Sequence, residues 1–180
     1  FLRGIAKYSL NDYVGSVEDF NKTLEIHPLY VRAYHYRGIA NDRLGNYADA
    51  KKDYAKAIAL DPYDAELHIA MGSTLLHLNE FEDAVASFDT AIIIKPDNAY
   101  AYINRGIAKR YLDRLDDAID DLNKAVYYDF FNAEALVRRG IIQMERENYH
   151  DALLDFNKAL KLDGDNSIIF FNRGTAYLNI

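Results

Sequence analysis

Small and apolar residues recur along this chain at one fixed interval. Glycine marks the interval, because six glycines follow one another at a constant spacing of 34 residues. They are Gly4, Gly38, Gly72, Gly106, Gly140 and Gly174. Two small residues and one large, mostly apolar residue follow at fixed distances. The first small position holds Ser16, Ala50, Ala84, Ala118 or Ala152; the second holds Thr23, Ala57, Ala91, Ala125 or Ala159; the large position holds Phe20, Tyr54, Phe88, Leu122 or Phe156. This periodicity predicts a repeated structural unit.

Each interval reads as a pair of helices. Residues 31–44 carry apolar side chains at helical spacing, Gly45 and Asn46 interrupt the pattern, and residues 49–60 resume it. Three prolines end the second helix of their units, because proline disfavours helix at the residue before it. They are Pro28, Pro62 and Pro96. A glycine within a helix costs about 1 kcal/mol relative to alanine, so its recurrence indicates that another helix packs closely against it.

The period, with its aromatic, glycine, alanine, aromatic, alanine and proline landmarks, resembles the tetratricopeptide repeat. The resemblance covers the whole chain. It implies an all-α fold, an α-solenoid in which antiparallel helix pairs with a 34-residue repeat form a right-handed superhelix. We expect one continuous solenoid of four full units and two partial ones: residues 1–30, 31–64, 65–98, 99–132, 133–166 and 167–180. Because both end units are cut within a hairpin, we expect a fragment of a longer protein of this family. Phe130 and Gly164 depart from the family pattern by replacing the terminal proline.

A row of arginines directly precedes the repeated glycines, and a row of aspartates follows 16 residues later. The pairs are Arg3 with Asp19, Arg37 with Asp53, Arg105 with Asp121 and Arg139 with Asp155, and Arg173 continues the row. In the third unit both positions change together, to Met71 and Ser87. This joint variation predicts that the two residues pair across the helix interface, where an unpaired charge is costly. The alternative is an anion-binding track. Pairing predicts that Asp121→Ala destabilises more than Asp121→Ser combined with Arg105→Met.

The resemblance also implies where partners bind. In this family the first helix of each unit lines the inner groove of the superhelix, which partners usually occupy. The candidate residues are His35, Tyr36, Ile39, Arg43, Ile69, Ser73, Leu76, His77, Tyr100, Ile103, Asn104, Ile107, Tyr111, Arg138 and Ile141. Such a largely apolar groove suits a peptide or helical segment of a partner protein, with Asn104 and Arg138 fixing its orientation. The alternative is that the isoleucines pack between neighbouring first helices.

Two further regions carry apolar side chains at predicted surfaces. Tyr127 and Phe131 flank a turn between units and are expected to be exposed, whereas Tyr128 falls on a buried position of the repeat. They form either a second contact patch or local packing that replaces the missing proline. The last helix has no second helix to cover its apolar residues, so we expect self-association through this C-terminal end. These residues are Ile168, Ile169, Phe170, Phe171, Leu178 and Ile180.

Composition narrows the function mainly by exclusion. The net charge of -7 argues against a surface built to grip nucleic acid or anionic lipid. The chain has no cysteine, which favours a reducing, cytoplasmic location and removes thiolate metal ligands and nucleophiles. No histidine pair has metal-binding spacing and no apolar run reaches the roughly 20 residues of a membrane span. We therefore expect no catalytic residue, metal or cofactor, and no membrane insertion.

The leading hypothesis is a protein-binding scaffold that is not an enzyme. Two alternatives stay open at this point. The chain is either the targeting or regulatory arm of a larger enzyme or assembly, or an RNA-binding helical repeat of the pentatricopeptide kind. Net acidity and the strict period of 34 residues favour the scaffold over the RNA-binding repeat.

Overall fold

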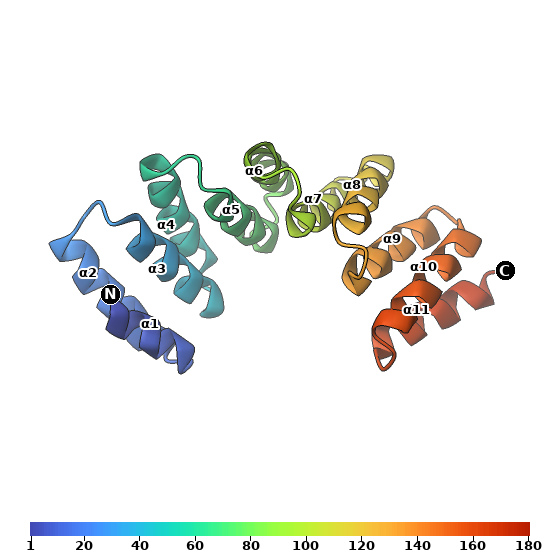
Figure 1. Cartoon of the computed structure of the whole chain (residues 1–180), viewed down its shortest axis with the longest axis horizontal. Coiled ribbons are helices and arrows are strands. Elements are labelled where there is room, and N and C mark those ends of the chain that lie inside the picture. Colours follow the sequence, from blue (N-terminus) through green and yellow to red (C-terminus); the bar gives the residue numbers. More distant parts are fainter. The chain divides into compact units, whose positions relative to one another are not determined.

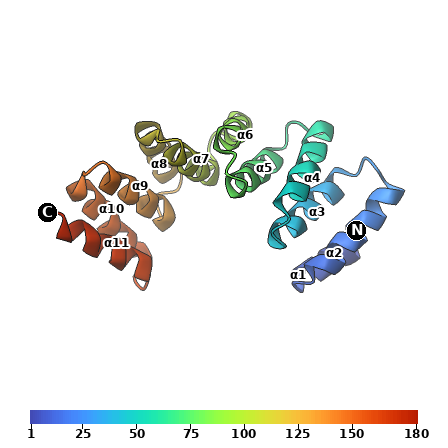
Figure 2. The same ribbon diagram turned by 180° about the vertical axis from the view of Figure 1, so that it is seen from behind.

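Helices account for all regular structure in the chain. The computed structural model describes residues 1–180 and divides them into two compact units, Phe1–Lys95 and Pro96–Ile180 (Figure 1). The first unit contains α1 (Leu2–Ser9), α2 (Tyr13–Ile26), α3 (Val31–Arg43), α4 (Tyr47–Leu60), α5 (Ala65–His77) and α6 (Phe81–Ile94). The second contains α7 (Ala99–Tyr111), α8 (Leu115–Tyr128), α9 (Ala133–Glu145), α10 (Tyr149–Leu162) and α11 (Ser167–Leu178). Figure 2 shows the same elements from behind.

Successive helices pair as hairpins, and the turn within each hairpin repeats one backbone feature. One residue of each turn has φ between 59° and 77°, in the left-handed region. These residues are Asn11, Gly45, Asn79, Asp113 and Glu147. Glycine and asparagine enter this region at the least cost, so Glu147 is the most strained of the five. The first helices of later hairpins begin at side-chain caps: Asn98 accepts a hydrogen bond from the backbone N–H of Ala101, and Asn132 from that of Ala135.

The second helices end in the same way with or without proline. α8 ends at Tyr128 and α10 at Leu162, although Phe130 and Gly164 replace the proline that follows α2, α4 and α6. The capping residues Asp129 and Asp163 have φ of -135° and -136°, close to the -137° of Asp61 before Pro62. The helix end at this position therefore does not require proline.

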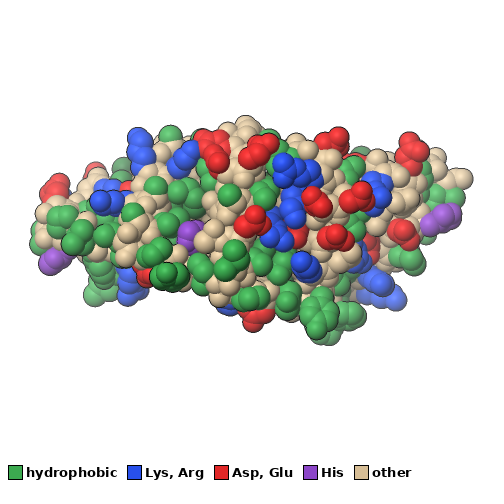
Figure 3. All heavy atoms as spheres, turned by 90° about the horizontal axis from the view of Figure 1, so that it is seen from above, with side chains coloured by type: hydrophobic (Ala, Val, Ile, Leu, Met, Phe, Trp, Pro, Cys, Tyr) green, Lys and Arg blue, Asp and Glu red, His purple; other side chains and the backbone are tan.

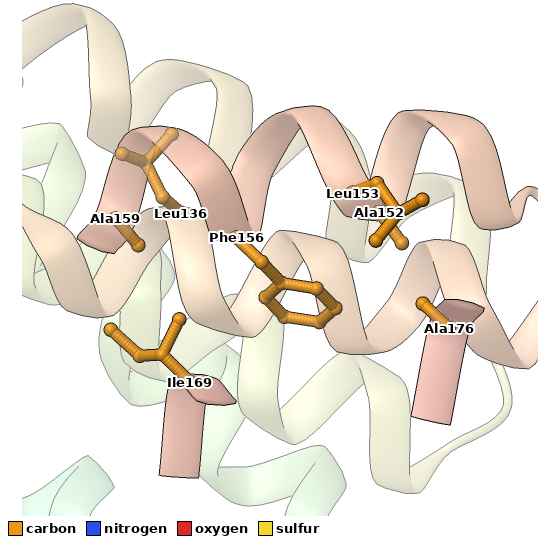
Figure 4. Packing of buried hydrophobic residues seen from close by; sticks show 7 residues of the cluster. All are labelled: Leu136, Ala152, Leu153, Phe156, Ala159, Ile169 and Ala176. Carbon is orange, nitrogen blue, oxygen red and sulfur yellow. The ribbon is translucent and has the colours of Figure 1, made fainter. Parts of the chain in front are cut away.

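The core of each hairpin lies where the two helices cross at the repeated glycine. A Cβ atom on Gly140 would stand 2.7 Å from Cε1 of Phe156, which shows how closely α9 approaches the ring on α10. The two small positions of α10, Ala152 and Ala159, are fully buried on either side of this ring. Figure 4 shows Phe156 at the centre of the cluster, with Ile169 of α11 packed beside it. Glycine and alanine thus allow close helix approach, and the aromatic ring fills the remaining space.

Neighbouring hairpins stack inside each unit. In the first unit α2 packs on α3, α4 on α5, and the first helices α3 and α5 touch. In the second unit α8 packs on α9 and α10 on α11, and α9 contacts both α7 and α11. The fold is therefore all-α and is an α-solenoid, as the sequence predicted. None of its helices has both the length and the apolar character required to cross a bilayer.

Candidate functional site

The row of arginines lies in the helix interfaces and pairs with the row of aspartates. Arg37 donates from Nε to Oδ2 of Asp53 at 2.9 Å and from Nη2 to Oδ1 at 2.5 Å. Arg3 with Asp19, Arg105 with Asp121, and Arg139 with Asp155 repeat this two-bond geometry. All four aspartates are buried. The predicted pairing is confirmed, and the two arginine nitrogens that would grip an anion are already engaged.

Three residues that the sequence interpretation did not use complete the aspartate environment. Lys7 lies 3.4 Å from Asp19, Asn41 donates to Asp53 at 3.3 Å, and Lys109 lies 2.7 Å from Asp121. All three stand three residues after the glycine, where the third hairpin has Leu75 opposite Ser87. The third residue after the glycine is therefore polar in the hairpins that have the aspartate and apolar in the third hairpin, which lacks the aspartate. Inspection of that third position would have revealed the contact from sequence.

Asparagines on the preceding hairpin hold the other end of the arginine. Nη1 of Arg37 donates to Asn21 at 2.6 Å, and Nη1 of Arg139 donates to Asn123 at 2.6 Å. The arginine therefore joins its own hairpin to the one before it. In the first hairpin, the hydrogen bond from Arg3 lowers the pKa of Asp19 to about 2, so this carboxylate stays ionised at neutral pH.

In the first unit the predicted groove residues lie on α3 and α5 with different accessibility. His35, Tyr36, Ile39, Ser73 and Leu76 are half-buried, Arg43 and His77 are exposed, and Ile69 is buried. Burial lowers the pKa of His35, so its ring is neutral at physiological pH. The His77 ring stacks on Tyr47 with centroids 4.6 Å apart, and Arg43 donates to the hydroxyl of Tyr8 at 3.2 Å.

In the second unit two of the predicted groove residues are packing residues. Ile103 is fully buried, and Asn104 is nearly so and donates its amide to the backbone oxygen of Tyr100 at 2.9 Å. The packing alternative therefore describes Ile103, as it does Ile69, and the Asn104 amide is not presented to a ligand. The more accessible members are Tyr100 and Tyr111, which are exposed, and Ile107, Arg138 and Ile141, which are half-buried.

A depression of about 340 Å³ lies between the first helices α9 and α11 of the second unit. Val137, Ile141, Ile168 and Ile169 form its apolar part, and Glu134, Arg138, Asp163 and Asn166 supply polar groups. Arg138 donates to Glu134 at 3.2 Å. The structure thus brings Arg138 and Ile141 together. Ile168, which was not among the predicted groove residues, occupies a groove position of the repeat six residues before Gly174.

A polar cluster joins three helices of the first unit. Asp42 of α3 accepts hydrogen bonds from the hydroxyl of Tyr54 at 2.7 Å and from that of Thr74 at 2.9 Å. Burial raises the pKa of both Asp42 and Tyr54 above their ordinary values. Since Thr74 belongs to α5, the cluster ties the second hairpin to the third, where the arginine is replaced by Met71.

The turn between α8 and α9 exposes more aromatic surface than predicted. Tyr127, Phe130 and Phe131 are all exposed. Tyr128 was expected to be buried, which is wrong, because 42% of it is accessible. Its ring instead stacks along Tyr102 with centroids 5.6 Å apart, at the edge of the hairpin.

Charge is mixed rather than segregated. Basic side chains lie beside acidic ones on the face shown in Figure 3. Nowhere do three or more histidine, cysteine, aspartate or glutamate residues converge in a way that could hold a metal ion. The helical hairpins and their interlocked cores define the class of protein as a helical-repeat protein.

Comparison with known families identifies the repeat. Profiles of the tetratricopeptide repeat match residues 1–65, 43–106, 99–132 and 133–166. The chain therefore belongs to the tetratricopeptide repeat family. Comparison with curated protein sequences finds no similar protein.

Solved structures show the same fold at low sequence identity. A tetratricopeptide repeat protein from Parabacteroides merdae ATCC 43184 is 20% identical with a TM-score of 0.87, over 98% of this chain and 70% of that one. MamA is 24% identical with a TM-score of 0.84, over 89% of this chain and 94% of that one. YrrB, described as a tetratricopeptide repeat protein with an unusual peptide-binding site, is 20% identical with a TM-score of 0.80, over 95% and 88%.

Proposed function

We propose that the chain is a protein-interaction scaffold that binds peptide or helical segments of partner proteins on the faces formed by the first helices of its hairpins. The observation that carries this proposal is the depression between α9 and α11, where an apolar floor is bordered by Glu134, Arg138 and Asn166. Apolar floors with a few polar groups at the rim are the usual chemistry of peptide sites. The family's general role as a scaffold, and the peptide-binding site named for YrrB, support the same reading.

The accessible side chains on these faces suit apolar segments with some polar character. Tyr100 and Tyr111 offer exposed aromatic rings on α7, and Ile107 lies half-buried between them in sequence. Exposed tyrosines bury a large area at little entropic cost, so they are effective anchors. On the face shown in Figure 3 the basic side chains are interspersed with acidic ones, and the net charge of -7 does not favour binding to phosphate backbones.

A matched pair of substitutions tests the site. Peptides that bind the chain are selected from a displayed library, and their affinities are measured by calorimetry for the wild type, Ile168→Glu and Ile93→Glu. Both isoleucines are exposed, at 61% and 79%, so neither change should disturb folding. We expect Ile168→Glu to weaken binding at least tenfold, about 1.4 kcal/mol, because it places a charge in the depression. Ile93→Glu lies on the second helix α6 and should bind normally.

The opposite pattern would contradict the proposed site. If both variants bind the selected peptides as tightly as the wild type does, the depression is not used. Loss of binding in Tyr127→Ala alone would move the site to the aromatic turn. Loss with Ile93→Glu but not Ile168→Glu would place binding on the second helices.

A further inference from the structure

Four aromatic side chains crowd the turn between α8 and α9, and three of them face solvent almost completely. Tyr127, Phe130 and Phe131 are 80%, 72% and 76% exposed, and Tyr128 is 42% exposed. These four residues form the aromatic turn. The backbone does not require them, because the residue that caps α8 has φ of -135°, against -136° at the equivalent residue after α10. Local packing in place of the missing proline therefore does not account for the three exposed rings.

The clustering of rings belongs to this turn and not to the repeat. At the same four positions the other turns between hairpins hold Glu25, Ile26, Pro28 and Leu29; Ala59, Leu60, Pro62 and Tyr63; Ile93, Ile94, Pro96 and Asp97; and Lys161, Leu162, Gly164 and Asp165. Tyr63 is the one aromatic residue among them, so the repeat needs no ring at any of these positions. Exposed apolar surface that folding does not require commonly marks a contact surface.

The rings are arranged so that each adjacent pair offers both a face and an edge. The ring centroids of Tyr127 and Tyr128 are 5.2 Å apart with an interplanar angle of 77°, and those of Phe130 and Phe131 are 5.5 Å apart at 90°. Because the face of an aromatic ring is negative and its edge is positive, such a pair can pack on an identical pair. A twofold dimer requires a self-complementary patch of this kind.

The charges beside the rings are self-complementary as well. Lys124 lies on α8 one helical turn before Tyr127 and Tyr128, Asp129 directly follows them, and both charged residues are exposed. Two copies related by a twofold axis perpendicular to the chain direction run antiparallel, so Lys124 of one copy lies toward Asp129 of the other. Each copy thus supplies one cation and one anion to the contact.

We infer that the aromatic turn binds a second copy of the chain, ring against ring across a twofold axis, with Lys124 of each copy beside Asp129 of the other. At about 200 Å² for a fully exposed aromatic side chain, each copy contributes roughly 500 Å². The total of about 1,000 Å² is at the lower limit for specific interfaces, so the dimer should dissociate on dilution. This surface is separate from the depression of the proposed function, which lies between α9 and α11 and includes none of these rings.

A lipid surface is a less favourable occupant of the aromatic turn. Insertion of the rings would carry the Asp129 carboxylate toward the lipid, where it loses water without gaining a partner. The net charge of -7 is also repelled by anionic headgroups. In the dimer, by contrast, Lys124 of the other copy compensates the carboxylate.

A substitution in the turn, paired with a matched control, tests the contact. Sedimentation equilibrium over a range of protein concentrations measures dimerisation of the wild type, Phe131→Glu and Tyr63→Glu. Tyr63 holds the same repeat position in another turn and is 82% exposed, so both changes should leave the fold intact. We expect the wild type to dimerise and Phe131→Glu to raise the dissociation constant about tenfold or more, because it places a charge on both sides of the contact. Tyr63→Glu should dimerise like the wild type.

A charge exchange tests the twofold arrangement. Lys124→Glu and Asp129→Lys should each weaken the dimer, because each leaves like charges facing one another across the axis. The double variant restores both ion pairs with reversed sign and should dimerise nearly as well as the wild type. Lysine is compatible with this helix end, because Lys95 occupies the position equivalent to Asp129 with φ of -131°. The series is repeated with Phe171→Glu, at a residue of α11 that is 73% exposed, so that association through that helix is measured separately.

Four results would overturn the inference. The first is a wild type that stays monomeric; if it then binds phosphatidylcholine vesicles and Phe131→Glu does not, the rings contact lipid instead. The second is equal weakening by Phe131→Glu and Tyr63→Glu, which would indicate nonspecific apolar association. The third is a dimer that Phe171→Glu abolishes and Phe131→Glu leaves unchanged, which would place the contact on α11. The fourth is a double charge variant that dimerises no better than the single ones, which would exclude the pairing of Lys124 with Asp129 of the other copy.

Discussion

Asp155→Ser should destabilise the second unit by more than the combined change Asp155→Ser with Arg139→Met. The single change leaves Arg139 facing a serine in a mostly buried interface, with Asn123 as its remaining partner. The double change reproduces Met71 and Ser87, which the third hairpin uses without a charge. The two variants therefore differ in whether an unpaired charge is left in the interface.

The structure sets the size of the effect. Breaking a fully buried pair costs about 3–5 kcal/mol. Because 17% of the Arg139 side chain remains accessible and the bond to Asn123 survives, we expect about 2–3 kcal/mol for Asp155→Ser. The double variant should lose about 1 kcal/mol or less, because methionine fills the volume that the arginine stem leaves.

Urea unfolding followed by circular dichroism measures these free energies for the wild type, both single variants and the double variant. The coupling energy between the two residues should be at least about 1–2 kcal/mol, the difference between Asp155→Ser and the double variant, and larger by the cost of Arg139→Met, which leaves the Asp155 carboxylate buried and unpaired. Repeat proteins can unfold in stages, so the slopes with urea must agree among the variants before the values are compared. Equal losses for Asp155→Ser and the double variant would refute the reasoning, because they would show that the arginine is not held by the aspartate.

Three other substitutions test the packing and the electrostatics. Gly140→Ala should lower the free energy of unfolding by about 1–3 kcal/mol, measured by thermal or urea unfolding, because its Cβ would meet the Phe156 ring. Gly174→Ala should raise it by up to about 1 kcal/mol from helix propensity alone. A change of the same sign in both variants would contradict the packing. The pKa of Asp19 is about 2 in the folded chain, below its unfolded value, so the stabilisation from its ion pair is complete above about pH 4 and is lost as pH falls toward 2. Asp19→Asn should therefore reduce the dependence of the unfolding free energy on pH in that window. An unchanged slope would show that the ion pair is not its cause. Burial raises the pKa of Asp42, so ionisation of this carboxyl reduces its contribution to folding stability as pH rises. The stability of Asp42→Asn relative to the wild type should therefore increase from pH 4 to pH 7. A shift in the other direction would contradict this assignment.

The repeat made most of the fold predictable. The glycines and small residues located the helix interfaces, and variation between units located the ion pairs, because each unit is an independent example of the same packing problem. The residues at the third position after the glycine, such as Lys109 and Leu75, carried the same information and were overlooked because they depart from the family pattern.

Accessibility on the first helices was less predictable. Ile69 and Ile103 occupy a repeat position that is accessible in other hairpins, yet both are buried. The reason is that the close approach of adjacent helices depends on side chains from more than one unit. Tyr128 illustrates the converse. It was expected to be buried, but the same repeat position is also accessible in other hairpins, as at Ile26 and Leu162, so the Tyr128 ring stacks on the buried Tyr102 and keeps its outer side exposed.

The third hairpin separates the ion pair between arginine and aspartate from the packing of the large residue against the repeated glycine. It has neither the arginine nor the aspartate, yet a Cβ on Gly72 would still meet Phe88 at 2.7 Å, as close as in the hairpins that keep the charges. Ring and glycine packing is therefore sufficient to close a hairpin. The ion pair adds little net stability beyond this packing but strongly disfavours any helix that presents no carboxylate to the arginine.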